Sequence, residues 1–276
     1  HIEVRTVLPD MQNAMGKPTI EIHYEMALPR DTSLSCRNNF GDTVVAGIGG
    51  TVAIDSSFGS VDMRDITGGV NVRARGEFPF LAQNLQQGGV FELHGANAVF
   101  RNVAGSTKIS NFWGAVEIHD LPPEANVDAA CESGPINLFL AAEGAPNISA
   151  TALYGEIQSD IPLDKVTQGD VTVAKSENAA SKQQVALRTS FREIAIRREG
   201  ETQTAATNPA VPTQPFKEVV TRTDAVLENS KILVEAITGD VRVVGTDTDV
   251  VRVSATKFVR VQSQSNVRAA LQALNV

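Results

Sequence analysis

The chain has 276 residues, of which 42% are hydrophobic and 20% charged, a composition typical of folded globular proteins rather than of disordered ones. Its formal net charge of −8 argues against nucleic acid or an anionic membrane surface as a partner, since both attract basic surfaces. No apolar run approaches the roughly 20 residues needed to cross a bilayer, so we expect no membrane-spanning segment.

The chain starts at His1 without a charged-then-apolar leader. We interpret this start as the result of removing a secretory signal, with an arbitrary segment boundary as the alternative. Residues 2–8, IEVRTVL, and 19–34, TIEIHYEMALPRDTSL, alternate apolar and polar residues. The second run predicts a long strand that ends at Pro29 and leads into the first repeat.

From about residue 40 to residue 160 one phrase recurs: an alternating run, an aromatic or small residue, a glycine, and a second alternating run. Three copies are VAIDSSFGSVDM at 52–63, TKISNFWGAVEI at 107–118 and ISATALYGEIQS at 148–159. The glycines from Gly41 to Gly155 recur every 17 to 21 residues. Period-two alternation with glycine at each corner predicts two short strands per coil of about 19 residues.

The fold class that follows is all-β: a β-solenoid-like stack of such coils, plus a short C-terminal helix. An antiparallel sandwich is the alternative, because regular strands with turn signals also fit it. Residues 1–198 are the predicted solenoid body, and the Thr-, Ala- and Pro-rich stretch 199–215 is a linker. Residues 216–276 contain further strands and, at 264–275, the helical pattern QSNVRAALQALN.

The stretch from Ile20 to Val72, with its strand, proline and repeated Gly-x-Val coils, resembles the putative-adhesin (toast-rack) family of prokaryotic cell-surface proteins. The resemblance covers about residues 20–160 and implies a β-solenoid without catalytic residues. In that family a phrase like LVEAITGDVRVV, a Val-rich strand and a short helix come before the proline-containing strand. Here LVEAITGDVRVV lies at 233–244, so the chain resembles a circularly permuted member.

This permutation leaves an incomplete coil at the N-terminal end and the missing piece at the C-terminal end. The piece could fold back on its own chain or complete the first coil of a neighbouring molecule. We favour the second arrangement, a head-to-tail homopolymer built by strand augmentation, because open solenoid ends expose unpaired strand edges. The predicted self-association residues are the apolar ones of this piece: Ile232, Val234, Val241, Val243, Val251, Val253, Leu271 and Leu274.

No enzymatic motif is present, and we expect neither an enzyme nor a bound cofactor or metal. The histidines and the two cysteines, Cys36 and Cys131, lack metal-binding spacing, and we expect both thiols to be buried. The interpretation of the acidic clusters is solvated turn carboxylates, with weak calcium binding as the alternative. Those clusters are Asp55, Asp62 and Asp65 in the body and Asp240, Asp247 and Asp249 near the C-terminus.

The sequence therefore predicts a structural, self-associating protein of the cell surface or extracellular space, such as an adhesin-like, filament or sheath subunit. The alternative is a carbohydrate-binding or carbohydrate-active solenoid that uses an aromatic ladder, with Trp113 and Tyr154 as stacking residues. A third interpretation is a signalling or envelope-stress domain released from a membrane-anchored parent. Asn147 heads a possible N-glycosylation sequon.

Overall fold

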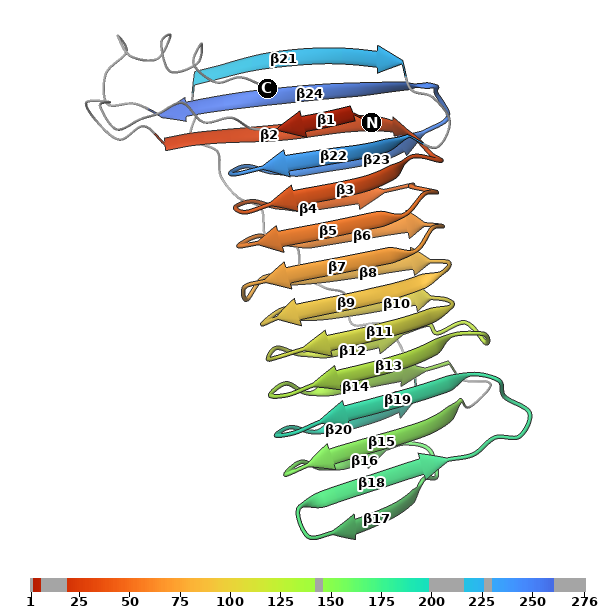
Figure 1. The fold of residues 1–276 in the computed structure, drawn as a ribbon. Helices are drawn as coiled ribbons and strands as arrows, with labels where there is room; N and C mark the ends of the chain where they lie inside the picture. The colour runs from red at the N-terminus through yellow and green to blue at the C-terminus, as the bar shows by residue number, and fades with distance from the viewer. Residues whose placement is uncertain (1, 6–18, 142–145, 199–215, 226–229, 261–276) are drawn as a thin grey trace.

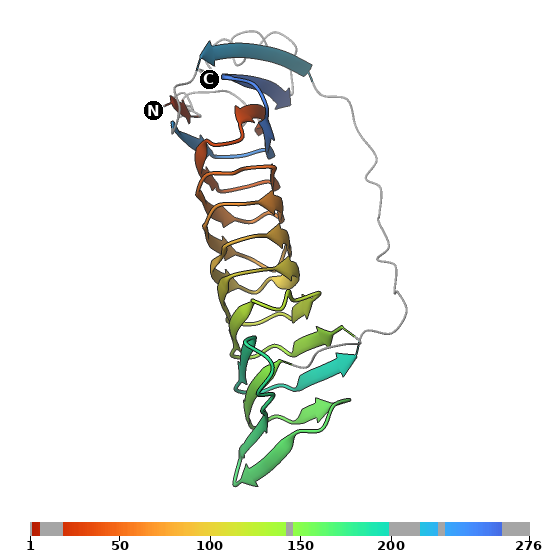
Figure 2. The same cartoon turned by 90° about the vertical axis from the view of Figure 1, so that its right-hand side faces the viewer.

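The chain folds as an elongated stack of β-coils. The computed structural model describes residues 2–5, 19–141, 146–198, 216–225 and 230–260, and in these ranges it forms 24 strands and no helix. Two 12-stranded sheets stand face to face along the stack (Figure 1), and a view turned by 90° separates them (Figure 2). The predicted all-β solenoid is confirmed, whereas the predicted helix at 264–275 lies outside the described residues.

The first sheet contains one strand of each coil. Its strands, in spatial order, are β1 (Ile2–Arg5), β22 (Lys231–Ala236), β3 (Ser33–Asn38), β5 (Val52–Ser57), β7 (Val70–Arg75), β9 (Gly88–His94), β11 (Ser106–Asn111), β13 (Asn126–Cys131), β19 (Gln184–Thr189), β15 (Asn147–Leu153), β18 (Val171–Ser176) and β17 (Asp164–Gln168).

The second sheet contains the other strand of each coil and closes the opposite face. Its strands, in spatial order from the same end, are β21 (Phe216–Ala225), β24 (Val250–Arg260), β2 (Thr19–Pro29), β23 (Val241–Thr246), β4 (Thr43–Ala46), β6 (Val61–Ile66), β8 (Pro79–Leu85), β10 (Asn97–Val103), β12 (Val116–His119), β14 (Ile136–Leu140), β20 (Ile194–Arg198) and β16 (Ile157–Ser159).

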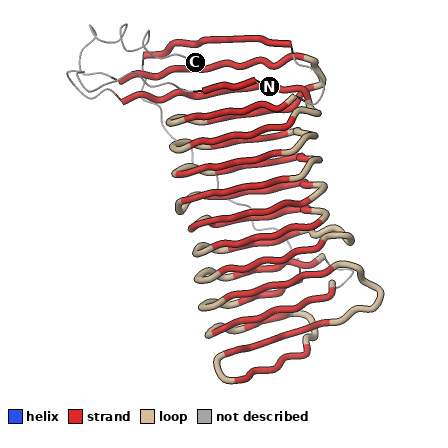
Figure 3. Tube along the Cα trace, viewed as in Figure 1, coloured by secondary structure: helices blue, strands red, loops and turns tan. Residues whose placement is uncertain are grey.

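Neighbouring coils pair in parallel and in register, which excludes the antiparallel sandwich. Val52 pairs with Val70, and Val70 with Gly89, so each coil repeats the position of the previous one after 18 or 19 residues. In strands of the repeated coils such as β5 and β7, inward residues are buried and outward ones are at least partly exposed. Short turns join the strands at both edges of the stack (Figure 3).

Apolar side chains fill the narrow space between the sheets along the whole stack. Among the largest buried side chains are Phe80, Phe91 and Phe100, whose ring centroids lie 5.0 to 5.8 Å apart in edge-on or tilted contacts. Cys36 and Cys131 are free thiols inside this core, as predicted. Burial raises the pKa of Cys36 to about 12, so its thiol stays protonated at neutral pH.

One edge of the stack is a column of corners in which successive backbones nearly touch. A β-carbon on Gly59 would overlap the carbonyl oxygen of Gly41 in the next coil. Gly41 itself has a φ of 128°, a conformation that residues with a β-carbon rarely adopt. The recurring glycine of the sequence phrase is therefore fixed both by close approach and by backbone conformation.

The opposite edge combines glycines, such as Gly50 and Gly68, with asparagine and aspartate. Asp65, Asn84 and Asn102 have φ values of 56°, 55° and 50°, in the left-handed region that these residue types tolerate best after glycine. Their side chains also bond along the stack: Asn84 donates to Asp65 at 2.8 Å, and Asn102 donates to Asn84 at 2.9 Å. A polar ladder thus ties consecutive corners together.

Two coils stand out of chain order. The coil β19–β20 lies between β13–β14 and β15–β16, although the glycine spacing implied that β15 would follow β13 directly. The coil β22–β23, 231–246, lies between β1–β2 and β3–β4. Position in the stack is therefore set by fit to the neighbouring coils and not by the order of synthesis.

The corner column yields a stability prediction. Gly59→Ala would force a β-carbon onto the Gly41 carbonyl, and we expect it to lower the free energy of unfolding by about 2–3 kcal/mol. The matched control is Gly69→Ala, because nothing lies within 4 Å of a β-carbon at that corner. Denaturant unfolding measures both variants. Equal stability of the two would contradict the close approach.

Candidate functional site: the C-terminal coil and the aromatic edge

The coil formed by β22 and β23 (the C-terminal coil, 231–246) is buried between two N-terminal coils. Ile232 of β22 stands in register with Ile2 on one side and with Leu34 on the other. In the second sheet, Val243 stands between Met26 and Val45 in the same way. The predicted self-association residues that the structure describes are all buried, with at most 7% exposure: Ile232, Val234, Val241, Val243, Val251 and Val253.

These apolar residues are the main source of stabilisation at the seam. Burying a valine or isoleucine fully contributes about 1.5–3 kcal/mol relative to leaving it exposed. Leu271 and Leu274, the remaining predicted self-association residues, lie outside the described residues. In the single chain of the structure the C-terminal coil completes its own solenoid. The same surfaces would be buried if a neighbouring molecule supplied it.

Charged pairs cross the seam between the C-terminal coil and the N-terminal strands. Arg37 donates to Glu235 at 3.0 Å, and Arg30 donates to Asp247 at 2.6 Å. Such exposed pairs contribute little individually, about 0–1 kcal/mol. Their arrangement matters more, because register places opposite charges on successive strands of the first sheet: Glu235, Arg37, Asp55, Arg73 and Glu92.

A third pair lies at the corner of the C-terminal coil. His23 Nδ1 lies 2.9 Å from Asp240 Oδ2, and the other carboxylate oxygen accepts the backbone N–H of Asp42 at 2.9 Å. The bond from His23, together with that from the Asp42 backbone, lowers the pKa of Asp240, and partial burial opposes the shift. Asp240 therefore connects β2, the C-terminal coil and the corner before β4.

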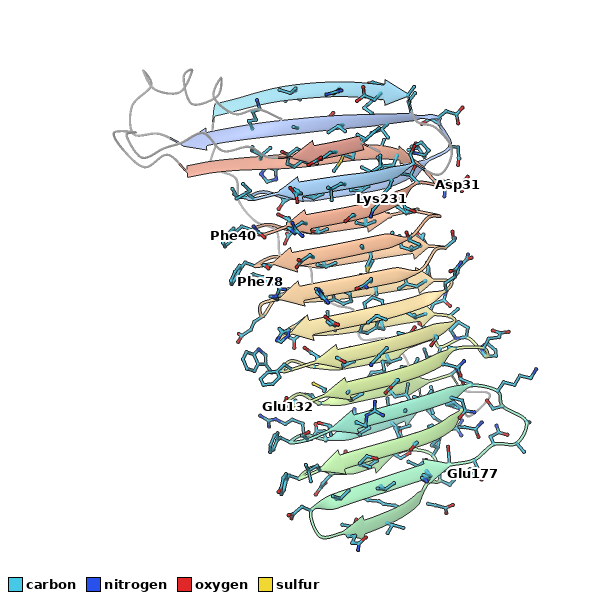
Figure 4. All side chains as sticks on the ribbon, in the orientation of Figure 1. Asp31, Phe40, Phe78, Glu132, Glu177 and Lys231 are labelled. Carbon is cyan, nitrogen blue, oxygen red and sulfur yellow. The ribbon has the colours of Figure 1, made fainter. Side chains whose placement is uncertain are left out.

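The edge that holds Gly41 and Gly59 also carries a column of exposed rings, and we call it the aromatic edge. Phe40 and Phe78 are labelled along it in Figure 4. Phe40 stacks on Phe58 with a centroid distance of 5.2 Å, and Tyr154 stacks on Phe191 at 5.8 Å, both nearly parallel. In the described part of the chain its exposed members are Phe40, Phe58, Phe78, Phe112, Trp113, Tyr154 and Phe191.

Trp113 and Tyr154, the predicted glycan-stacking residues, both lie on this edge but not in contact. Trp113 is 47% exposed and packs edge-on against Phe112, while its indole covers Gly95 of the neighbouring coil. The sequence phrase had not pointed to Phe191. It follows the alternating run VALRT, but Arg192 stands where the other copies have glycine.

The Asn147 side chain makes two hydrogen bonds to the segment between β18 and β19. Its side-chain nitrogen, the atom to which a glycan would be attached, donates to the Ser181 carbonyl at 2.8 Å. Its side-chain oxygen accepts the backbone N–H of Asn178 at 2.6 Å. A glycan on this nitrogen would leave it a single hydrogen and would have to fit beside the bond to Ser181, which connects β15 to the turn before β19.

The acidic residues of the two clusters and the histidines each contact different partners. Asp55 pairs with Arg75 at 3.1 Å and Asp62 with Arg64 at 2.7 Å. His94 stacks on Phe112 in the first sheet, whereas His119 is buried in the second sheet against Phe139. Within the described ranges, no three His, Cys, Asp or Glu side chains gather in a way that could hold a metal ion.

Comparisons with known proteins give little beyond this geometry. No protein-family model and no curated protein matches the chain. Among solved structures, a putative cell adhesion protein from Clostridium sporogenes ATCC 15579 matches with 12% identity and a TM-score of 0.25, over 66% of this chain and 100% of that one. We draw no argument from a likeness at this level, and the family resemblance stays a prediction. No helix in the described ranges is long and apolar enough to cross a membrane.

The Asp240 contacts predict acid sensitivity of the C-terminal coil. Because its pKa is lowered in the folded coil, the contribution of Asp240 to stability is complete above the ordinary aspartate pKa of about 3.9 and is lost as pH falls through the lowered value. We expect hydrogen exchange of the β23 amides to accelerate in that acid range. Asp240→Asn should remove this component, whereas Asp249→Asn, at an exposed turn, should leave it intact.

Proposed function

We propose that the protein is a structural, non-enzymatic subunit of an extracellular surface layer or filament. In this polymer the segment 216–276 of one molecule supplies the C-terminal coil of the next. The supporting observation is that this coil is held by buried residues and charged pairs on both sides, although the 17 residues 199–215 separate the segment 216–276 from the body of its own chain.

The length of that connection favours exchange between molecules. Arg198 ends β20 and Phe216 begins β21, and these strands stand ten positions apart in the second sheet, about 48 Å. The two strands run in the same direction, so the end of β20 and the start of β21 also lie at opposite edges of the stack. Seventeen residues reach about 60 Å when fully extended, and about 53 Å in the extended conformation that proline-rich linkers favour.

Closing the solenoid within one chain therefore takes up most of the reach of the connection. In a head-to-tail row, the end of one molecule that carries β20 faces the end of the next that receives the segment. The gap then falls to a few strand spacings, which a relaxed connection covers. The buried contacts are identical in the two arrangements, and the shorter gap between neighbouring molecules supports the polymer.

A disulfide between register partners distinguishes the two arrangements. Leu233 on β22 pairs with Ser35 on β3, and both side chains are partly exposed. Parallel strand spacing suits a disulfide between these positions. We expect Leu233→Cys with Ser35→Cys to give covalent ladders of oligomers on non-reducing gels. The native thiols are buried and should not interfere.

The control is each single substitution, which should give no ladder. A double variant that forms its disulfide entirely within one chain, at every protein concentration used for assembly, would contradict the polymer. Electron microscopy of the same samples should show filaments before oxidation, so the ladder reports an assembly that already exists.

The aromatic edge supports a second candidate function, binding of surface glycans. Flat, exposed rings at intervals along a rigid axis suit stacking against sugar rings. We expect Tyr154→Ala to weaken binding of a responsive glycan on an array by about fivefold to tenfold. Val166→Ala removes an equally exposed apolar group away from this edge and should have no effect. Glycan binding that survives both Tyr154→Ala and Trp113→Ala would exclude the edge as the site.

A further inference from the structure

The outer face of the first sheet is hollowed beside the aromatic edge. One column of outward-facing residues there, in register from β9 to β15, is Glu92, Ser110, Ala130, Arg188 and Thr151. The short side chains of Ser110 and Ala130 stand between two long ones that lie three strand spacings apart, about 14 Å. A hollow of about 700 Å³ lies over this gap, and its volume is within the range of small-molecule sites.

The side of the hollow next to the aromatic edge is an aromatic wall. Phe112 and His94 both line the hollow, and their rings stack with a centroid distance of 6.2 Å. Phe112 also packs edge-on against Trp113, which holds its ring in place. Because Phe112 is still 40% exposed, part of its ring can contact a ligand. A flat apolar ring beside hydrogen-bonding side chains suits a sugar, which has both apolar faces and hydroxyl groups.

The charged residues at the two ends of the gap are compensated from outside the hollow. Arg73 donates to Glu92 at 2.7 Å, and Arg188 donates to Asp128. Neither Arg73 nor Asp128 lines the hollow, so each pair leaves one of its members facing the hollow. A carboxylate and a guanidinium each have several hydrogen-bonding positions, so Glu92 and Arg188 can bind a ligand without giving up these partners.

The remaining polar groups of the lining disfavour an anionic ligand. Ser110, Thr151 and Ser190 supply hydroxyl groups, and Glu132, which Figure 4 labels at this edge, supplies a further carboxylate. Since the guanidinium of Arg188 is already paired, the hollow has no excess of positive charge to offer. A neutral ligand rich in hydroxyl groups would instead find both donors and acceptors.

We propose that this hollow binds a short stretch of a neutral glycan. One sugar ring stacks on Phe112, and its hydroxyl groups bond to Glu92 and Arg188. The proposal rests on the glycan-binding function given above as the second candidate, and it adds the class of glycan and the residues that select it. These polar residues belong to strands β9 and β19 of the sheet face, whereas Trp113 and Tyr154 lie at the corners.

Filling the hollow tests the site. Ser110→Arg places a long side chain in the gap, and the same column already holds arginine in other coils, at Arg37 and Arg73, so the fold should accept it. On an array of neutral, carboxylated and sulfated oligosaccharides, we expect the full-length chain to bind neutral ones and Ser110→Arg to bind them about tenfold more weakly. The matched control is Ala53→Arg, on the same face but outside the hollow, and it should bind as the unsubstituted chain does. Equal affinities of these two variants would overturn the proposal.

A second variant tests the site without added bulk. Arg188→Gln removes a charged donor from the hollow and should weaken binding of neutral oligosaccharides by about fivefold. Its control is Arg101→Gln on the second sheet, an exposed arginine that also has an acidic partner, Asp120. Thermal unfolding of each variant checks that it is folded. Binding by Arg188→Gln that equals binding by Arg101→Gln would overturn the role of Arg188. A preference for carboxylated or sulfated oligosaccharides would overturn the neutral ligand.

The same array separates this proposal from the function on which it rests. Binding that is lost in Trp113→Ala and Tyr154→Ala but unchanged in Ser110→Arg keeps the aromatic edge as the glycan site and rejects the hollow. Binding that is lost in Ser110→Arg but survives both aromatic substitutions keeps the hollow and excludes the edge. An array on which the full-length chain binds no glycan rejects both.

Discussion

The structure depends on one constraint: each coil must fit two neighbours about 4.8 Å away, in register, at every position along its length. Each residue must therefore fit the equivalent residues of the coils above and below as well as its own strand. At one edge the column admits glycine, because the backbones nearly touch at Gly59 and Gly41. At the other edge it admits residues that tolerate a left-handed backbone, such as Asp65 and Asn84. The repeated phrase in the sequence records these columns.

A second consequence is that a coil is recognised by its fit and not by its place in the chain. Both β19–β20 and the C-terminal coil enter the stack between coils that are made earlier. The C-terminal coil is held by its register with the coils on both sides, whereas β19–β20 is also tied to β15 through the turn that precedes β19, by the bond from Asn147 to Ser181. Exchange between molecules then changes no contact, and the balance between a closed monomer and a polymer is left to the connecting segment and to protein concentration.

The sequence predicted the coil, its two strands and its glycine corners, because these depend on local alternation and turn residues. It did not predict the place of β19–β20. Arg192 stands there in place of the recurring glycine. The glycine spacing also cannot show that a later coil lies between two earlier ones. For the same reason it placed Tyr154 on the aromatic edge without its partner Phe191. The seam pairs, such as Arg30 with Asp247, join residues 217 apart, and only the register of the C-terminal coil brings them together.

An exposed strand edge and the space between two coils differ in which strands they can accept. A bare strand edge accepts any strand, and Lys165 at the β16–β17 end prevents this. The space between β1–β2 and β3–β4 is more demanding, because the inserted coil must bury apolar residues on both inner faces, and its Glu235 then lies beside Arg37. A segment shifted by one residue would turn its valines outward and lose the charge match. This space thus distinguishes the correct coil from other strands, and a polymer built through it would grow only by copies of this chain.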